Sequence, residues 1–135
     1  MDKLGILATT GTISTGLFQT ALMDVGIESL VPSESDQNDL IMEAIYGDDG
    51  VKAGYCRGVS TDRLVTAASN LKANGAQGII AGCTEVPLAL KQADVDVPLI
   101  DPMDVLAVKA IHFCGVELKR SMESIPMLGI VSADV

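Results

Sequence analysis

The stretch Gly-Ile-Ile-Ala-Gly-Cys-Thr-Glu, residues 78–85, is the clearest indication of the fold class. Its first four residues form an apolar run with the length of a short buried strand. Gly82 interrupts this run, and a helix is expected to begin near Thr84. The order of strand, tight turn and helix is the unit from which parallel sheets are built, and Cys83 lies at its junction.

The same order recurs along the rest of the chain. Residues 4–8 form an apolar segment, 9–12 a turn-rich segment and 13–25 an apolar pattern with helical spacing. Further strands are predicted over 27–31 and 97–100, and further helices over 33–46, 61–74 and 101–114, with a glycine-rich break over 47–58. Short strands that alternate with helices need crossover connections, which make neighbouring strands parallel. We therefore predict an α/β fold, a doubly wound parallel sheet of about four strands with helices on both faces.

The length and hydropathy favour one domain. The chain has 135 residues, of which 48% are apolar, so it can bury a core of ordinary size but not two independent ones. We assign residues 1–115 to a single α/β domain. Residues 116–135 fall outside the alternating pattern and are expected to form a C-terminal arm or an additional strand.

The composition excludes several classes of partner. Nine Lys and Arg residues stand against 18 Asp and Glu residues, and the formal net charge of −9 would repel nucleic acid and anionic membrane surfaces. The chain has two Tyr, two Phe and no Trp, so it offers no platform for stacking bases or sugars. These features predict a small polar ligand, with no nucleic acid and no membrane as partner.

The cysteine and histidine content points away from a metal site. Three cysteines without a CxxC pair and one histidine give no spacing typical of a zinc site, so no metal is expected. An odd, sparse set of cysteines suits a reducing compartment, and no apolar run is long enough to cross a membrane. We expect a cytoplasmic protein.

Ligands of doubly wound sheets bind beyond the carboxyl ends of the strands, which directs attention to residues 9–12 and 82–85. Cys83 follows a strand and precedes a helix, where backbone N–H groups and the helix dipole would favour its thiolate. A thiolate there would be a base. The alternative is a small buried residue at the end of a strand, a common place for a free cysteine.

Hydroxyl and carboxylate groups surround these two positions. Thr84 and Glu85 could hold a substrate and tune the thiol, although Glu85 could equally be a first-turn acid that only suits the dipole. Thr9 and Thr12, on either side of Gly11, form a hydroxyl-rich turn suited to a carboxylate or phosphate, or only to turn and cap chemistry.

Lys52 lies in the glycine-rich break and could reach over a pocket to hold a carboxylate, or it could be a solvated loop lysine. Cys56 is in the same loop, beside Arg57. Cys114 is predicted to be part of the core, because it shares an apolar face of the last helix. His112 lies off that face and is expected to be exposed.

Four segments carry a resemblance to a known family. Residues 78–88, Gly-Ile-Ile-Ala-Gly-Cys-Thr-Glu-Val-Pro-Leu, resemble the second catalytic segment of the cofactor-independent aspartate/glutamate racemases. Residues 4–12, 51–54 and 98–102 agree in order and spacing, so the resemblance covers about residues 4–112. Glu85 after Cys83-Thr84 looks like the aspartate racemase branch, because glutamate racemases usually carry His at that place.

The resemblance implies an isomerase that needs no pyridoxal phosphate or other cofactor. In this family two cysteines on opposite faces of the substrate α-carbon exchange its proton, and Cys83 would be one of them. Lys52 would hold a carboxylate of a small dicarboxylic amino acid. Thr84, Thr9 and Thr12 would donate hydrogen bonds, and Glu85 would complete the substrate-binding set.

The resemblance also implies that a part of the site is missing. Members of the family have two similar α/β halves, and every matched segment belongs to the second half. The partner cysteine usually stands in a Cys-Asn-Thr segment, and neither Cys56 nor Cys114 has that context. The chain would then be a partial racemase, completed by a homodimer or by association with a missing first half.

Two other functions remain open. One is a decarboxylase-like enzyme similar to the arylmalonate decarboxylases, in which one thiol protonates the carbanion left when carbon dioxide departs. The other is a non-catalytic domain that binds a small acid or serves assembly.

Overall fold

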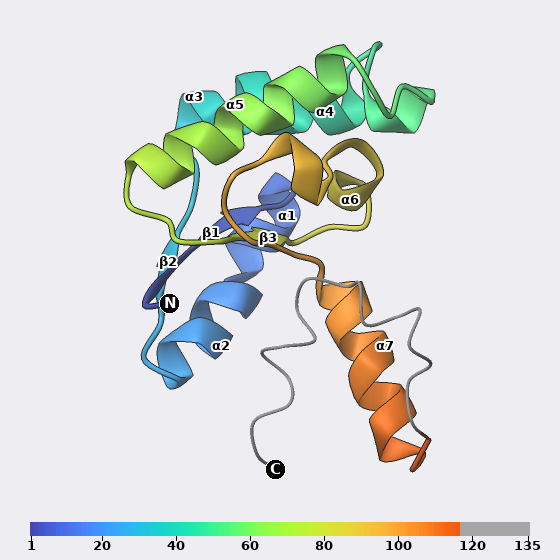
Figure 1. The fold of residues 1–135 in the computed structure, drawn as a ribbon. Coiled ribbons are helices and arrows are strands. Elements are labelled where there is room, and N and C mark those ends of the chain that lie inside the picture. The colour runs from blue at the N-terminus through green and yellow to red at the C-terminus, as the bar shows by residue number, and fades with distance from the viewer. Residues whose placement is uncertain (117–135) are drawn as a thin grey trace.

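The computed structural model describes residues 1–116, which form one parallel sheet covered by helices (Figure 1). Four strands are arranged in the order β2-β1-β3-β4: β1 (Lys3–Leu7), β2 (Glu28–Leu30), β3 (Ile79–Ala81) and β4 (Leu99–Ile100). All neighbouring pairs are parallel, with Leu7 opposite Ala81 at the carboxyl ends of the central strands. The predicted α/β class and parallel sheet are confirmed.

Helices lie on both faces of the sheet (Figure 1). One face carries α3 (Glu34–Asp36), the π-helix η1 (Gln37–Met42), α4 (Glu43–Tyr46) and α5 (Val59–Ala73). Towards the other face lie α1 (Thr10–Thr15), α2 (Leu17–Asp24) and α7 (Pro102–Phe113). The short helices η2 (Val51–Ala53), α6 (Val86–Ala89) and η3 (Gln92–Asp94) lie in the loops between the longer elements.

The two faces differ in how much apolar surface they bury. The core fills the space between the sheet and α4, α5 and α6, where the largest side chains are fully buried: Leu7, Ile41, Ile45, Leu64, Leu71, Ile79 and Val86. On the other face α1 and α2 bury no side chain fully, and α7 buries only Val108. The face formed by α2 and α7 is therefore largely uncovered within the described chain.

Two predicted helices are less regular than their apolar spacing suggests. The helix predicted over 13–25 breaks at Gly16, whose left-handed φ of 66° ends α1 and starts α2. The helix predicted over 33–46 begins after Ser33, which caps it: the Ser33 hydroxyl accepts the backbone N–H of Asp36 at 3.1 Å. It then widens into the π-helix η1, an insertion that apolar spacing does not reveal.

Cys114 is exposed, so its predicted place in the core is wrong. The last helix does have an apolar face, but it contacts the body mainly through Val108, and Phe113 in its last turn is 94% exposed. His112 is exposed, as predicted. The expected arm or strand over 116–135 falls almost entirely outside the described residues.

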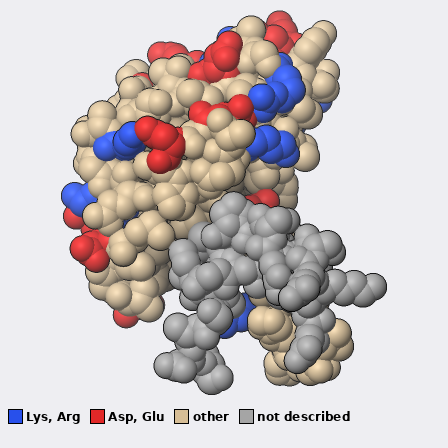
Figure 2. All heavy atoms as spheres, in the orientation of Figure 1, with Lys and Arg blue, Asp and Glu red and all other residues tan. Residues whose placement is uncertain are grey.

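Charged side chains of both signs are interspersed on the face seen in Figure 2. Several form ion pairs, among them Lys3 with Glu28 and Arg63 with Asp49. Over residues 1–116, none of the helices combines the length and the apolar character needed to cross a bilayer.

Candidate active site

The two loops singled out in the sequence lie side by side. β1 and β3 are adjacent and parallel, and the backbone N–H of Gly82 donates to the carbonyl of Leu7 at 2.8 Å. The segment after β1, which carries Thr9 and Thr12, therefore meets the segment after β3, which carries Cys83. Adjacent parallel strands whose carboxyl ends coincide place these loops together, as the sequence predicted.

Cys83 is half-buried. Hydrogen bonding from the backbone N–H groups of Val86, Glu85 and Thr9 favours the thiolate and lowers the pKa of the thiol. Burial has the larger effect and raises the pKa of Cys83 above its ordinary value, and the negative charge of Glu85 raises it further.

The predicted stabilisation of the Cys83 thiolate is therefore wrong for this chain as it stands. The helix that follows the thiol, α6, has only four residues, so its dipole is small and does not offset desolvation. Cys83 is a protonated thiol at neutral pH. In this state it can donate a proton, and it becomes a base only when its surroundings change or the pH rises.

A cavity of about 140 Å³ is lined in part by Cys83 and Thr84. Its floor is the end of β3, and its walls come from Phe18 of α2 and from Pro102 and Met103 of α7. Gly82 leaves the room for it: a side-chain carbon at this position would come within 2.9 Å of Ala8 and 3.1 Å of the Phe18 ring. The cavity is about the size of a small amino acid, and it opens on the uncovered α2 and α7 face.

Lys52 contacts the same loop through Glu85, although neither of these two residues lines the cavity. Its Nζ atom lies 3.4 Å from Oε1 of Glu85 and 4.6 Å from the centre of the Tyr46 ring. The hydrogen bond to Glu85 is the main cause that raises the pKa of Lys52, with Tyr46 contributing. Lys52 is 47% exposed, so its ammonium remains open to a ligand.

Glu85 is held between two partners. The Thr84 hydroxyl donates to its Oε2 at 3.2 Å, and Lys52 approaches its Oε1. Burial tends to raise the pKa of Glu85, but its own backbone N–H, Lys52 and Thr84 together outweigh burial and hold the pKa below its ordinary value. Glu85 is thus ionised at neutral pH and links Lys52 to the Cys83 loop.

The hydroxyl-rich turn is ordered by its own hydrogen bonds. The Oγ1 atoms of Thr9 and Thr12 lie 3.2 Å apart, and Thr9 caps α1 by accepting the Thr12 N–H at 3.5 Å. This is the cap chemistry left open in the sequence. The Thr9 and Thr12 hydroxyls are half-buried, and the backbone N–H of Thr9 contributes to lowering the pKa of Cys83.

Gln37 was missed in the sequence, yet it supports this turn. Gln37 is the first residue of η1, its side chain is buried, and its amide donates to the carbonyl of Ala8 at 2.9 Å and to the Thr10 hydroxyl at 3.3 Å. The one available signal was a polar residue within an otherwise helical apolar pattern. Gln37 thus fixes the backbone just before the Thr9 N–H that faces the thiol.

The other two cysteines lie elsewhere. Cys56 is partly buried against the core, and Cys114 is exposed at the end of α7. Neither lines the cavity beside Cys83. Among the described residues, Cys83 is the sole thiol at this cavity.

A larger hollow of about 310 Å³ lies between α5 and η3. Its rim includes Lys72 and Asp96, which form an ion pair with each other, and none of the predicted site residues lines it. Within residues 1–116, no group of three His, Cys, Asp or Glu side chains is arranged to hold a metal ion.

Comparison with known proteins agrees with the resemblance seen in the sequence. Residues 1–110 match the sequence profile of the family described as Asp/Glu/Hydantoin racemase. The chain is 36% identical over 96 residues to an uncharacterised protein of the pnlA 3′ region of Pectobacterium carotovorum subsp. carotovorum, covering 67% of this chain and 57% of that protein.

Two crystal structures are similar in fold. A protein from Yersinia pestis assigned as an Asp/Glu racemase is 32% identical, with a TM-score of 0.74, over 84% of this chain and 48% of that one. An aspartate racemase homologue from Pyrococcus horikoshii OT3 is 26% identical, with a TM-score of 0.72, over 84% of this chain and 49% of that one. The chain thus spans about half the length of these relatives. With four-fifths of its residues matched by the family profile, the chain belongs to the Asp/Glu/Hydantoin racemase family.

Proposed function

We propose that this chain provides one wall of a cofactor-independent racemase site for a small dicarboxylic amino acid, aspartate or glutamate. The observation that carries the proposal is the position of the Cys83 thiol. Cys83 lines a cavity of about 140 Å³, backbone N–H groups around it favour its thiolate, and its loop carries Glu85, which pairs with the ammonium of Lys52. Such a site can hold a carboxylate and move a proton at the neighbouring carbon.

Each residue of the proposed site has a role that follows from its side-chain chemistry. Cys83 exchanges the proton at the α-carbon. Lys52 binds a substrate carboxylate and is released in part from Glu85 when it does so, since both carboxylates compete for one ammonium. Thr9, Thr12 and Thr84 donate hydrogen bonds to the substrate.

Glu85 has two effects on this chemistry. It holds Lys52 at the rim of the site before substrate binds, and its charge raises the pKa of Cys83, which favours the protonated thiol. A thiol that starts protonated is suited to deliver a proton to one face of a carbanion. Racemisation then needs a base on the opposite face.

The opposite face is the one that this chain leaves open. The cavity is bordered by α2 and α7, whose apolar side chains are exposed, including Leu17, Met103, Leu106 and Phe113. Exposed apolar patches of this kind are typical of interaction surfaces. We propose that a second copy of the chain or a separate first half covers this face and supplies the second thiol, in the reducing environment of the cytoplasm.

A decarboxylase-like reaction is the second candidate. The raised pKa of Cys83 and the apolar walls from Phe18 and Met103 favour a reaction in which one thiol protonates a carbanion from one side only. This reaction requires no second thiol. It differs from racemisation in that carbon dioxide is released and the product lacks one carboxylate.

The test of the proposal is protection of Cys83 from alkylation. The purified chain is treated with iodoacetamide, and the modification of each cysteine is followed by peptide mass spectrometry with L-aspartate, D-aspartate or L-glutamate present. Protection of Cys83 by either amino acid, with no change at the exposed Cys114, is the expected result. Equal modification of Cys83 at all ligand concentrations would overturn the proposed substrate class.

A further inference from the structure

The loop that carries Lys52 and the loop that carries Cys83 and Glu85 are joined at the site by a single ion pair. Lys52 is 47% exposed, and ion pairs with exposed partners contribute little to holding two segments together. The helix α6, which begins directly after Glu85, has four residues, and its Val86 and Ala89 side chains are fully buried in the core. Polar contacts at its far end add directional restraints to this apolar packing.

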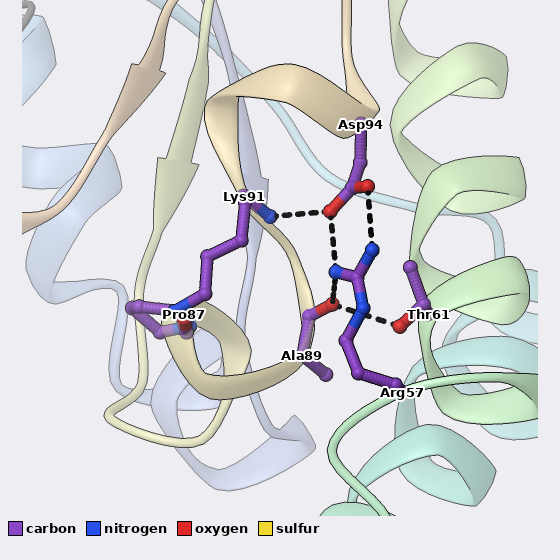
Figure 3. A network of polar contacts seen from close by, with 6 residues as sticks. All are labelled: Arg57, Thr61, Pro87, Ala89, Lys91 and Asp94. Carbon is purple, nitrogen blue, oxygen red and sulfur yellow. Dashed lines mark hydrogen bonds and ion pairs between the residues drawn. The ribbon is translucent and has the colours of Figure 1, made fainter.

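Figure 3 shows a network at the opposite end of α6 that does so. The guanidinium of Arg57 forms a bidentate pair with Asp94, with Nη1 to Oδ2 at 2.8 Å and Nη2 to Oδ1 at 3.0 Å. The Arg57 side chain is itself 60% exposed, so the pair differs from an ordinary surface ion pair in its bidentate geometry and not in its burial. Arg57 also donates to the carbonyl of Ala89, the last residue of α6, at 3.3 Å. The buried hydroxyl of Thr61 donates to the same carbonyl at 2.9 Å.

These contacts tie three parts of the chain to one helix end. Arg57 follows the Lys52 loop, Thr61 lies in the first turn of α5, and Asp94 ends η3. Asp94 also accepts the backbone N–H of Lys91 at 2.8 Å, while the Lys91 ammonium bonds to the carbonyl of Pro87 inside α6. The fork of Arg57 satisfies two acceptors from different segments at once, which a lysine could not do with the same geometry.

We propose that Arg57 is a positioning residue for the racemase site: through Ala89 and Asp94 it orients α6 so that Glu85 meets Lys52 beside Cys83. The effect of Arg57 on substrate binding rests on the proposed function, whereas its contacts with α6 do not. Arg57 touches neither the cavity nor Cys83, and it acts through the short helix between them.

The test asks whether Arg57 and Lys52 act jointly on the reactivity of the Cys83 thiol. The pH dependence of Cys83 alkylation is measured in the full chain for Lys52→Met, Arg57→Gln and the double variant. In the unaltered background, Lys52→Met moves the midpoint of alkylation to higher pH, because the charge of Glu85 is no longer neutralised and it raises the pKa of Cys83. In the Arg57→Gln background the same substitution has a smaller effect, because Glu85 and Lys52 are no longer held together.

The controls separate positioning from loss of stability. Lys72→Gln removes another ion pair, with Asp96, which joins α5 to the neighbouring loop without touching α6. The Lys72→Gln substitution is expected to leave the shift that Lys52→Met causes in the alkylation midpoint of Cys83 unchanged. Arg57→Lys restores that effect in part, because it keeps the charge but loses the fork. Cys114, which is exposed, reports any general change in reactivity.

The expected non-additivity is about twofold or more in the alkylation rate at fixed pH, the low end for groups in one hydrogen-bonded network. Equal effects of Lys52→Met with and without Arg57 would overturn the inference. The readout needs no substrate. If Arg57 and Lys52 prove coupled but amino acids do not protect Cys83 from alkylation, the positioning role stands and the proposed function is rejected. If amino acids protect Cys83 but Arg57 and Lys52 act independently, the proposed function stands and the positioning role is rejected.

Discussion

The ammonium of Lys52 lies 3.4 Å from a carboxylate oxygen of Glu85, although the two residues come from different loops on different sides of α5 in the chain. This contact holds a half-exposed cation against the loop that carries Cys83. In the proposed function, a substrate carboxylate replaces Glu85 as the partner of this cation. The relation between these two residues would then set both the affinity of the site and the protonation of its thiol.

Replacing Lys52 with Met is expected to weaken binding of the amino acid. The substitution keeps the length of the side chain and removes the charge-assisted hydrogen bond, which predicts a loss of about tenfold or more in affinity. The concentration of aspartate that protects Cys83 from iodoacetamide measures this loss. Lys72→Gln is the matched control, since it removes a lysine paired with a carboxylate away from the cavity. Equal protection in both variants would exclude Lys52 from the substrate site.

Glu85→Gln is expected to shift the alkylation of Cys83 to lower pH. The negative charge of Glu85 raises the pKa of Cys83, and its removal also leaves the Lys52 ammonium unneutralised nearby. Both changes favour the thiolate. The rate of alkylation is measured against pH for Cys83, with Cys114 in the same samples as reference. A midpoint that stays in place or rises would show that Glu85 does not act on the thiol.

Gly82→Ala is expected to close the cavity and to destabilise the fold. A Cβ atom at this position would lie 2.9 Å from the Ala8 side chain and 3.1 Å from the Phe18 ring, so β1 or α2 must shift. Overpacking of this kind costs about 1–3 kcal/mol of unfolding free energy. Gly11→Ala is the control, because a Cβ there has open space in α1 and favours the helix. Urea unfolding of both variants tests this prediction, and a stability of Gly82→Ala equal to that of Gly11→Ala would refute it.

Asp94→Asn is expected to lower stability at neutral pH but not in acid. The hydrogen bond from Arg57 is the main cause that holds the pKa of Asp94 below its ordinary range, so the folded state binds this proton less readily than the unfolded state does. The stabilisation is present above the ordinary carboxyl pKa and is lost as the pH falls through the lowered value. Thermal midpoints of the two proteins should therefore converge towards low pH. A constant difference at all pH values would contradict the role of the Asp94 charge.

The sequence predicted the parallel sheet because each strand is a short apolar run bounded by turn residues, as in residues 78–82. It also placed Thr9 and Cys83 at the carboxyl ends of strands, which follows from a parallel sheet, but the strand order that makes β1 and β3 neighbours was not predicted. Gly16 was not recognised as a helix end, because apolar residues continue at helical spacing through it. The buried role of Gln37 depends on a π-helix, a local insertion without a clear sequence pattern.

Two predictions were incorrect, the stabilised thiolate of Cys83 and the buried position of Cys114, because both depend on tertiary packing. The pKa of Cys83 depends on how much burial opposes three backbone N–H groups, and a sequence contains the groups but not the burial. Cys114 lies on an apolar helix face, as the spacing indicated, but that face has no partner among residues 1–116. An apolar pattern predicts that a face is suited to burial, and it does not say which surface covers it.

Proton exchange at the substrate α-carbon tests the proposed racemase chemistry most directly. The measurement is proton NMR of L-aspartate and L-glutamate in deuterated buffer with the purified chain and with Cys83→Ser. We predict that the α-proton signal decays, faster as the pH rises towards the raised pKa of Cys83, and that the substitution slows the decay by about 100-fold or more. Decay at the same rate in Cys83→Ser, or no decay with the unaltered chain at high concentration, would contradict the central claim.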